Sequence, residues 1–483
     1  MKKSITKSYI YNLSYQFVLI ISPLIVAPYI ARILGAESIG IYSYTQSIVT
    51  NFKLFASIGI SLYAQVEIAY VQNDIDKRSK LFWEIISLRI LSTVLLLVPY
   101  IIYATNISEY KLLYMIQTID IIAVLFDITW FFQGLEEFKK VAFINIIVKI
   151  TEVVFILIFV KSPDDLWIYI LCYSLALIVS NLLLWIFLKK FLKSIKISIL
   201  ELKKHIYPVI YLFFPQMATQ IYSVLDKTLL GIIINLKVEN GYYEQSQRII
   251  RSVLLIITAL GTVMTSRIAK EFAADNMKKI NDYIYKSFQF ILFLSFPAAC
   301  GIFSIADSFV PFFYGNGYDK VIIILRILSP VIIFIGLSNV IGMQYLIPLK
   351  KYKEFTISVL TGAIINVTLN LILITHYKSI GVSIAIIIAE LFVVIIQFFF
   401  IKSEINIFMI WKMCSNYVIS SIIMMVVIMF YRYINKPSII TMGFQIIIGT
   451  IIYLTCLVLV RDEGFLSVIK RLKMKGQNHN DNY

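Results

Sequence analysis

The sequence predicts an all-α integral membrane protein with about 14 transmembrane helices. Hydrophobic residues make up 59% of the 483 residues, charged residues make up 15%, and the mean hydropathy is +0.84. Soluble domains contain about 45–50% apolar and about 25% charged residues, so an ordinary globular enzyme is excluded. The same arithmetic excludes a disordered chain, a collagen-like chain and a disulfide-stapled secreted domain.

Apolar runs long enough to cross a bilayer recur along the whole chain. A transmembrane helix needs about 20 mostly apolar residues. The first run follows Met1-Lys2-Lys3 without a short apolar region and a small-residue cleavage site, so no removable signal peptide is predicted. The predicted spans are 10–31, 39–64, 81–105, 111–132, 141–160, 166–188, 208–234, 244–266, 286–306, 321–346, 355–375, 379–402, 412–433 and 439–460.

Short connections and one Lys-rich stretch divide these spans into groups. No loop is long enough to fold into a separate catalytic domain. We predict an N-terminal six-helix lobe at 1–190, a basic cytoplasmic linker at 191–207, a C-terminal six-helix lobe at 208–402, two additional helices at 403–460 and a basic cytoplasmic tail at 461–483.

Lysine and arginine concentrate in alternate loops, as in Lys139-Lys140 and Lys189-Lys190. Cytoplasmic loops of membrane proteins carry an excess of these residues. Placing the N-terminus in the cytoplasm puts most of the basic loops on that side. We therefore predict an even number of spans with both termini cytoplasmic. The net charge of +16 then indicates membrane orientation and not a nucleic-acid partner.

A weak internal repeat relates the two halves of the chain. Gly40-Ile-Tyr-Ser-Tyr-Thr-Gln-Ser-Ile48 opens the second span, and Gly241-Tyr-Tyr-Glu-Gln-Ser-Gln-Arg-Ile249 opens the eighth. Six spans separate them, so both have the same orientation in the membrane. This predicts two pseudo-symmetric lobes around a central cavity, related by an axis along the membrane normal, as in alternating-access transporters.

Polar residues follow one face of each of these two spans, at helical spacings of three and four. A cation at the centre of a membrane helix costs about 2.5–3.5 kcal/mol, so it must meet water, an acid or an anionic ligand. A water-filled cleft is the favoured interpretation, and helix–helix contact is the alternative. Lys227 and Arg89 on other spans extend the set, with charge compensation as the alternative for Lys227. The candidate ligand-binding residues are Lys53, Arg248, Arg251, Lys227, Arg89, Gln46, Gln247 and Thr50.

Four acids within the spans are candidates for protonation or cation coupling, because intramembrane carboxylates mark such pathways. They are Asp120, Asp127, Asp226 and Glu390. Lys149 and Glu152 are one helical turn apart and are predicted to form a structural pair.

No catalytic or metal-binding constellation is found in the sequence. The three histidines, His205, His376 and His479, are expected in loops or the tail and show no metal-ligand spacing. The GxxxxGK[ST] phosphate loop is also missing, so ATP hydrolysis by this chain is not expected. We therefore expect no enzymatic activity, no cofactor and no metal.

Several motifs resemble one family. Pro28-Tyr-Ile-Ala-Arg-Ile-Leu-Gly35, Trp130-Phe-Phe-Gln-Gly-Leu-Glu-Glu-Phe138 and Asp226-Lys-Thr-Leu-Leu-Gly231 are similar to segments of bacterial polysaccharide repeat-unit flippases. These are the O-antigen and capsule exporters of Wzx type, within the multidrug/oligosaccharidyl-lipid/polysaccharide exporter superfamily.

The resemblance implies translocation of undecaprenyl-diphosphate-linked oligosaccharides from the cytoplasmic to the outer leaflet of the bacterial cytoplasmic membrane. It also implies a cavity lined by spans 1, 2, 7 and 8. The cations that it carries over by position, as ligands of the diphosphate, are Lys53, Arg248, Arg251, Lys227 and Arg89.

The implied partners are lipid-linked oligosaccharide and membrane lipids. Coupling to H+ or Na+ and contact with a polysaccharide polymerase and chain-length proteins stay open, and nucleic acid is not expected. Two alternatives are a multidrug or cation antiporter of the same superfamily and a membrane polysaccharide polymerase or ligase. An antiporter should carry unpaired acids in its lumen and usually has twelve spans. A polymerase or ligase should carry an extended outer loop.

Overall fold

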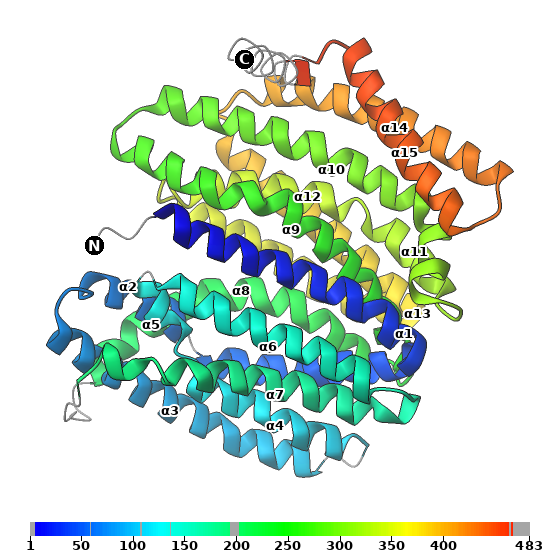
Figure 1. Cartoon of the computed structure of the whole chain (residues 1–483). Helices are drawn as coiled ribbons and strands as arrows, with labels where there is room; N and C mark the ends of the chain where they lie inside the picture. The colour runs from blue at the N-terminus through cyan, green and yellow to red at the C-terminus, as the bar shows by residue number, and fades with distance from the viewer. Residues whose placement is uncertain are drawn as a thin grey trace, which may run out of the picture. The chain divides into compact units, whose positions relative to one another are not determined.

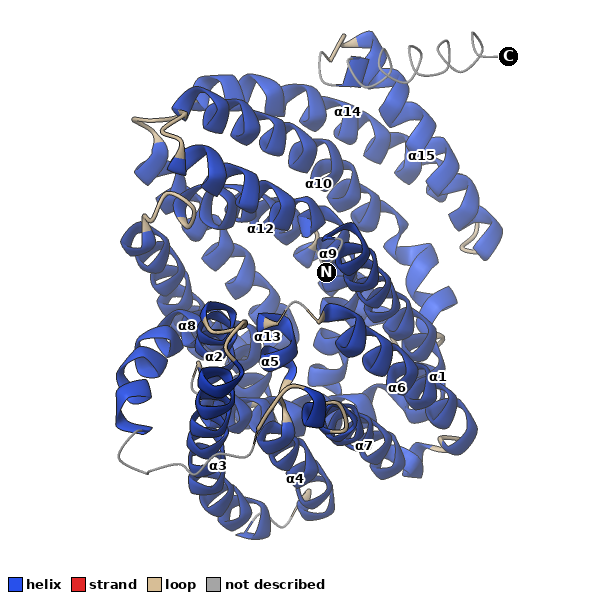
Figure 2. Cartoon of the chain, turned by 60° about the vertical axis from the view of Figure 1, so that its left-hand side comes forward, coloured by secondary structure: helices blue, strands red, loops and turns tan. Residues whose placement is uncertain are grey.

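The computed structural model describes residues 5–57, 59–106, 109–135, 137–193, 202–462 and 465–466. Within these ranges the chain is helical and contains no strand (Figure 2). The chain divides into two compact units, Met1–Glu244 and Gln245–Tyr483. Residues 194–201 of the predicted linker, and 463–464 and 467–483 of the predicted tail, lie outside the described residues. The predicted lobe boundaries stay a prediction.

The first unit is a helical bundle that ends in the first turns of α9 (Figure 1). Within it α1 contacts α6, and α4 contacts both α3 and α7. Its elements are α1 (Ile5–Ser57), α2 (Ile60–Tyr70), α3 (Ile75–Asn106), α4 (Lys111–Phe126), α5 (Thr129–Gly134), α6 (Phe138–Phe159), η1 (Pro163–Asp165), α7 (Leu166–Trp185), η2 (Leu188–Lys190), α8 (Lys203–Ile233) and the beginning of α9 (Val238–Ala273).

The second unit contains the rest of α9 and six further α-helices of the described chain. Helix α10 packs against α12, α14 and α15, so it forms the centre of this bundle. The elements are α10 (Met277–Tyr314), α11 (Asp319–Leu328), α12 (Val331–Ser338), the π-helical η4 (Asn339–Leu346), α13 (Tyr352–Ile401), α14 (Ile407–Ile434) and α15 (Ile439–Leu459).

Every predicted span falls mainly on helical residues of the described ranges, because a long apolar run specifies a membrane helix locally. Ten helical segments of the described chain are long and apolar enough to cross a membrane. Two of them, Ile21–Tyr70 and Tyr352–Ile401, are 50 residues long, and each includes parts of two predicted spans. The seventh and eighth predicted spans lie on α8 and α9, which are 31 and 36 residues long. The predicted all-α, multi-pass membrane fold is confirmed.

Three spans that we predicted as continuous are interrupted. The span at 39–64 is divided between α1 and α2, the span at 111–132 breaks after Phe126, and the span at 321–346 is divided among α11, α12 and η4. Conversely, the predicted loop between spans 1 and 2 is absent from α1. The helix continues from one span into the next and only kinks at Gly35, which has a φ of 74°. A glycine adopts this left-handed region at little cost. Helix α13 has a similar kink at Lys378, with a φ of 54°.

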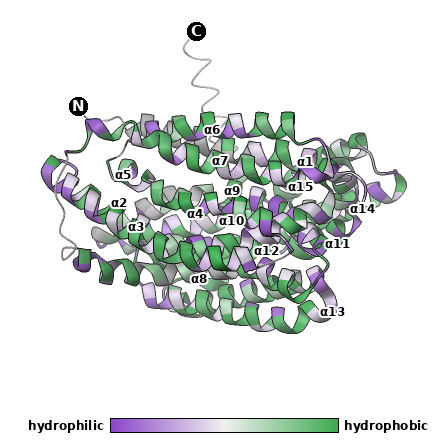
Figure 3. Ribbon diagram, turned by 90° about the horizontal axis from the view of Figure 1, so that it is seen from below, coloured by the Kyte–Doolittle hydropathy of each residue, from purple (hydrophilic) through white to green (hydrophobic). Residues whose placement is uncertain are grey.

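Large apolar side chains cover the outward faces of the helices. On α3, for example, Leu91, Leu95 and Val98 are 61%, 70% and 56% exposed. Figure 3 shows hydrophobic residues along the lengths of the helices and hydrophilic residues near many of the turns. Soluble monomers rarely expose apolar surface on this scale, whereas in a bilayer the acyl chains cover it.

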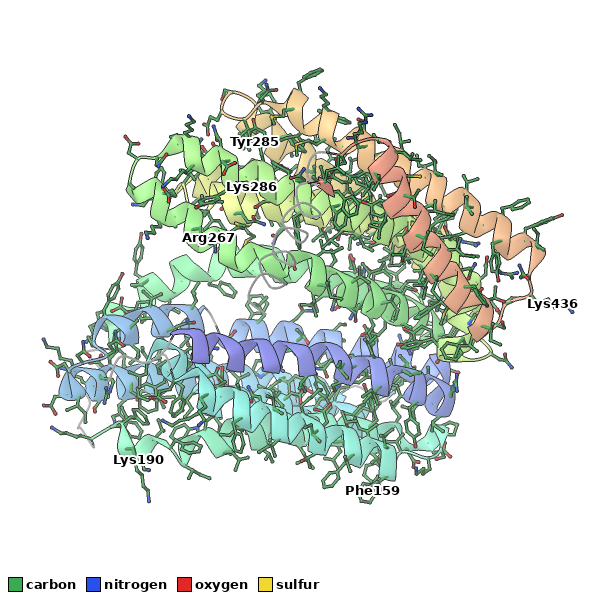
Figure 4. The ribbon with its side chains drawn as sticks, turned by 45° about the horizontal axis from the view of Figure 1, so that its top comes forward. Phe159, Lys190, Arg267, Tyr285, Lys286 and Lys436 are labelled. Atoms are coloured by element: carbon green, nitrogen blue, oxygen red, sulfur yellow. The ribbon has the colours of Figure 1, made fainter. Side chains whose placement is uncertain are left out.

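The basic turns of the first unit gather at one end. Arg78, in the first turn of α3, donates from Nη2 to the carbonyl of Phe191 at 2.6 Å, and so joins two Lys-rich stretches. Lys190 lies at this end and Phe159 at the other, and both are exposed (Figure 4). Alternate basic loops produce this arrangement when successive helices run up and down through a membrane.

Candidate functional site

The second half of α1 and the first turns of α9 cross with their backbones in contact. A Cβ atom added to Gly40 would lie 1.7 Å from the carbonyl oxygen of Lys237, and one added to Gly241 would lie 1.9 Å from that of Ala36. Each glycine therefore meets the carbonyl four residues before the other glycine. Reciprocal contacts of this kind are produced by a two-fold axis, so the crossing supports the repeat predicted from the sequence.

Polar groups lie one turn beyond this crossing. Ser43 Oγ donates to Glu244 Oε2 at 3.1 Å, and these are the two residues that the repeat pairs with each other. Lys227 of α8 forms an ion pair with the same carboxylate, and the two side chains are only 12% and 13% exposed. Next to Lys227, the buried carboxylate of Asp226 accepts a hydrogen bond of 2.8 Å from Tyr243 Oη. The ammonium of Lys227 is thus compensated by an acid on another helix.

Lys237 closes the turn between α8 and α9. Its Nζ donates to the carbonyl of Gly231 at 2.5 Å and lies 4.1 Å from the centroid of the Tyr44 ring. Burial of the ammonium lowers the pKa of Lys237, and Glu109 opposes this shift. We did not predict a role for Lys237, because nothing in the sequence shows that a lysine in a short turn is buried.

A buried hydrogen-bond network joins the second half of α1 to α4. Gln46 Nε2 donates to Asp120 Oδ2 at 3.1 Å, and Gln117 Nε2 donates to Gln46 Oε1 at 3.0 Å. The Asp120 and Gln117 side chains have no exposed surface. Thr50 Oγ1 donates to the Gln46 carbonyl of its own helix. The structure therefore brings the candidate ligand-binding residue Gln46 together with the candidate coupling residue Asp120.

Arg89 lies at the break between α4 and α5. Its fully buried guanidinium donates to the Asp127 carbonyl, to Asp127 Oδ2 at 3.1 Å and to Ser61 Oγ at 2.5 Å. A break in a membrane helix frees backbone carbonyls that no water reaches in the hydrocarbon region. Arg89 satisfies one of them and also pairs with the carboxylate of the same residue. These contacts explain how the guanidinium can be buried, so no bound ligand is needed to explain it.

The remaining candidates differ in exposure. In the first unit Lys53 is half-buried. In the second unit Gln247 is 6% exposed, Arg248 is half-buried and Arg251 is exposed. The carboxylate-bearing residue Glu390 of α13 is 5% exposed. Lys53 and the two arginines belong to different units, so their convergence on one cleft stays a prediction.

The structure corrects our placement of two histidines. His376 lies within α13, and His205 lies in the first turn of α8 and is only 2% exposed. His205 Nε2 lies 2.8 Å from Glu84 Oε2, and His205 Nδ1 lies 2.6 Å from Tyr63 Oη. Sequence spacing could not reveal this cluster, because Glu84 and Tyr63 are 121 and 142 positions away from His205.

The predicted pair Lys149–Glu152 is confirmed, with 2.6 Å between Nζ and Oε1. It lines a cavity of about 160 Å³ between α6 and α7, together with Asn145, Tyr173 and Ser180. Across the described ranges, no group of three or more His, Cys, Asp or Glu side chains could hold a metal ion.

Comparisons with known proteins agree with this architecture. The sequence is 24% identical over 408 residues to the Escherichia coli protein named "Putative O-antigen transporter", which covers 83% of this chain and 98% of the relative. The fold is similar to the solved structure "Lipid II flippase MurJ, inward closed conformation", with a TM-score of 0.75 and 19% identity over 95% of this chain and 99% of the other.

A second solved structure, an inward-facing multidrug resistance MATE family transporter of the MOP superfamily, gives a TM-score of 0.60 and 15% identity over 84% of this chain and 99% of the other. The family described as "Polysaccharide biosynthesis protein" matches residues 5–270, which is more than half of the chain. This match confirms the resemblance that the sequence motifs indicate, and the chain belongs to the polysaccharide biosynthesis protein family.

Proposed function

We propose that the protein is a flippase that moves undecaprenyl-diphosphate-linked oligosaccharides across the membrane for surface polysaccharide biosynthesis. The observation that carries this proposal is the sequence likeness to a protein named as an O-antigen transporter, which this chain matches over 98% of that protein's length. The fold likeness to a lipid II flippase supports it, with a higher TM-score and coverage than the multidrug transporter.

The charged residues of the spanning helices fit such a cargo. A lipid diphosphate combines an apolar tail, which stays in the bilayer, with an anionic head group that must cross it. Arg251 is exposed on α9, in a helix that covers a predicted span. The guanidinium of Arg matches phosphate oxygens in bidentate fashion. Lys53, Arg248 and Lys227 are assigned to the same head group, and Gln46, Gln247 and Thr50 to its sugars.

Transport is assigned to alternating access by the two predicted lobes, with both termini in the cytoplasm and the chain in the bacterial inner membrane. The basic turns that gather at one end of the first unit support this orientation, because cytoplasmic loops are Lys- and Arg-rich. Arg89 belongs to this proposal only as a support of the α4–α5 break.

Coupling to an ion gradient is assigned to one of the intramembrane acids. Asp127 and Asp226 are held by Arg89 and Tyr243. Asp120, Asp226 and Glu390 suit the role better than Asp127, because all three are buried, whereas Asp127 is paired with a cation.

The test is transport of an undecaprenyl-diphosphate-linked oligosaccharide in vesicles that contain the purified protein. Arg251→Ala and Lys53→Ala should each lower the initial rate about tenfold or more, because each variant loses a charge-assisted hydrogen bond that the proposal assigns to the diphosphate of the cargo. Lys436→Ala is the matched control, since Lys436 is exposed in the turn after α14 (Figure 4). Unimpaired transport by both Arg251→Ala and Lys53→Ala at normal protein levels would reject the assignment of these residues.

A further inference from the structure

A line of four polar side chains in contact lies where α8 meets α2 and α3. His205 stands between Glu84 and Tyr63, and Lys204 Nζ lies 2.9 Å from the Glu84 carboxylate. Glu84 and His205 are 1% and 2% exposed, whereas the Lys204 side chain is 54% exposed. Glu67 on α2 also acts electrostatically on Tyr63. Tyr63 on α2, Glu84 on α3 and Lys204 on α8 are the titratable groups that the described contacts place in this cluster.

We propose that this cluster is a proton-binding site, in which a proton on His205 and the ammonium of Lys204 compete as the counter-ion of Glu84. Any coupling of this site to transport rests on the flippase function proposed above, whereas proton binding by the site does not.

The imidazole has hydrogen-bond partners in both of its charge states. When His205 is neutral, Nε2–H donates to the Glu84 carboxylate and Nδ1 accepts from the Tyr63 hydroxyl. When His205 is charged, both ring nitrogens donate, and the Tyr63 hydroxyl rotates to accept. Both ring nitrogens keep a partner in each state, and only the Tyr63 hydroxyl hydrogen has to turn away from the ring, so the site can gain and lose a proton without rearrangement of the helices.

Charge balance decides which cation stays with Glu84. With neutral His205, the buried carboxylate and the ammonium of Lys204 cancel. A proton on His205 adds a second cation next to a single buried carboxylate, and a buried charge without a counter-charge is costly. Lys204 is the cation that can leave, because its side chain already reaches the surface and can extend into water. Each bound proton therefore releases one lysine at the start of α8.

The test is the titration of His205 by NMR of the imidazole, with the protein in lipid nanodiscs. His376→Gln and His479→Gln leave His205 as the single histidine of the chain. In that background, Lys204→Gln should raise the titration midpoint by about one pH unit, and Glu84→Gln should lower it by about one. Lys203→Gln is the matched control, because Lys203 is an exposed neighbour with the same charge, and it should leave the midpoint unchanged.

Opposite shifts by the first two variants, with none by the control, support the proposal. Equal midpoints in all variants, or the same shift for Lys203→Gln as for Lys204→Gln, would overturn it. Lys204→Gln keeps the test informative if the buried Glu84→Gln variant does not fold. Vesicle transport under an imposed pH gradient then separates the two proposals. If His205 titrates as expected but the wild-type protein moves no lipid-linked sugar, only the flippase proposal fails.

Discussion

Two ionic clusters of the first unit differ in how completely they enclose their cation. The guanidinium of Arg89 has no exposed surface and is divided among acceptors on Asp127 and Ser61. The ammonium of Lys204 faces the buried carboxylate of Glu84 but is itself half exposed. An enclosed cation has no alternative partner, so it fixes structure. A cation at the edge has water as an alternative, so it can be exchanged.

The largest effect should follow from removal of the enclosed cation. Arg89→Met should lower the free energy of unfolding by about 3–5 kcal/mol, because it breaks the ion pair with Asp127 and removes the donor to Ser61. Unfolding by SDS in mixed micelles measures this loss. Arg89→Lys is the control and should recover only part of it, because an ammonium lacks the planar fork of the guanidinium. A loss below about 1 kcal/mol would contradict the comparison, because Arg89 would then contribute no more to stability than a surface ion pair.

Lys227 is an intermediate case, since its side chain is 12% exposed. Lys227→Met should destabilise the protein by about 1–3 kcal/mol, because Glu244 loses a charged partner. Glu244→Gln in the same chain should restore part of the loss, since no carboxylate is then left at this position without the ammonium of Lys227. A double-mutant cycle measures this coupling. Strictly additive losses would show that the two side chains do not stabilise each other.

Lys204→Gln should cost at most about 1 kcal/mol in the same unfolding assay, because the Lys204 side chain is 54% exposed and His205 stays beside the buried Glu84 carboxylate. The same variant should shift the titration of His205. Lys204 would then affect the proton affinity of His205 strongly and the free energy of unfolding only weakly. A loss as large as that for Arg89→Met would mean that Lys204 is fixed and not exchangeable.

The smallest effect belongs to Asp74, at the surface turn before α3. Its Oδ1 accepts hydrogen bonds from the backbone N–H groups of Lys77 and Asp76, which hold the pKa of Asp74 below its ordinary value. A carboxylate with a lowered folded pKa stabilises the protein above its unfolded pKa of about 3.9, and this contribution is lost as the pH falls through the folded pKa.

Asp74→Asn should therefore differ from the wild type near neutral pH, and the difference should shrink on acidification. Unfolding measured between about pH 2 and 6 brackets this window. A difference that is constant over the whole range would show that the charge of Asp74 contributes nothing.

The sequence predicts the spans of this protein far better than it predicts the contacts between them. An apolar run such as 439–460 specifies its helix by its own composition, and α15 matches it within one residue. The break after Phe126 depends on Arg89, which reaches the freed carbonyl from another helix. Likewise, the burial of His205 depends on Glu84 and Tyr63, and no local pattern in the sequence records those partners.

The crossing of Gly40 and Gly241 has a consequence for the origin of the fold. In a homodimer, a residue on the symmetry axis meets its own copy, so one substitution changes both sides at once. If the two halves descend from a duplicated gene, the glycines preserve that ancestral self-contact. One turn away, Ser43 faces Glu244, an unlike pair that a homodimer could not have made. Only within a single chain can two such equivalent positions differ, so the partnership of Glu244 with Lys227 requires that asymmetry.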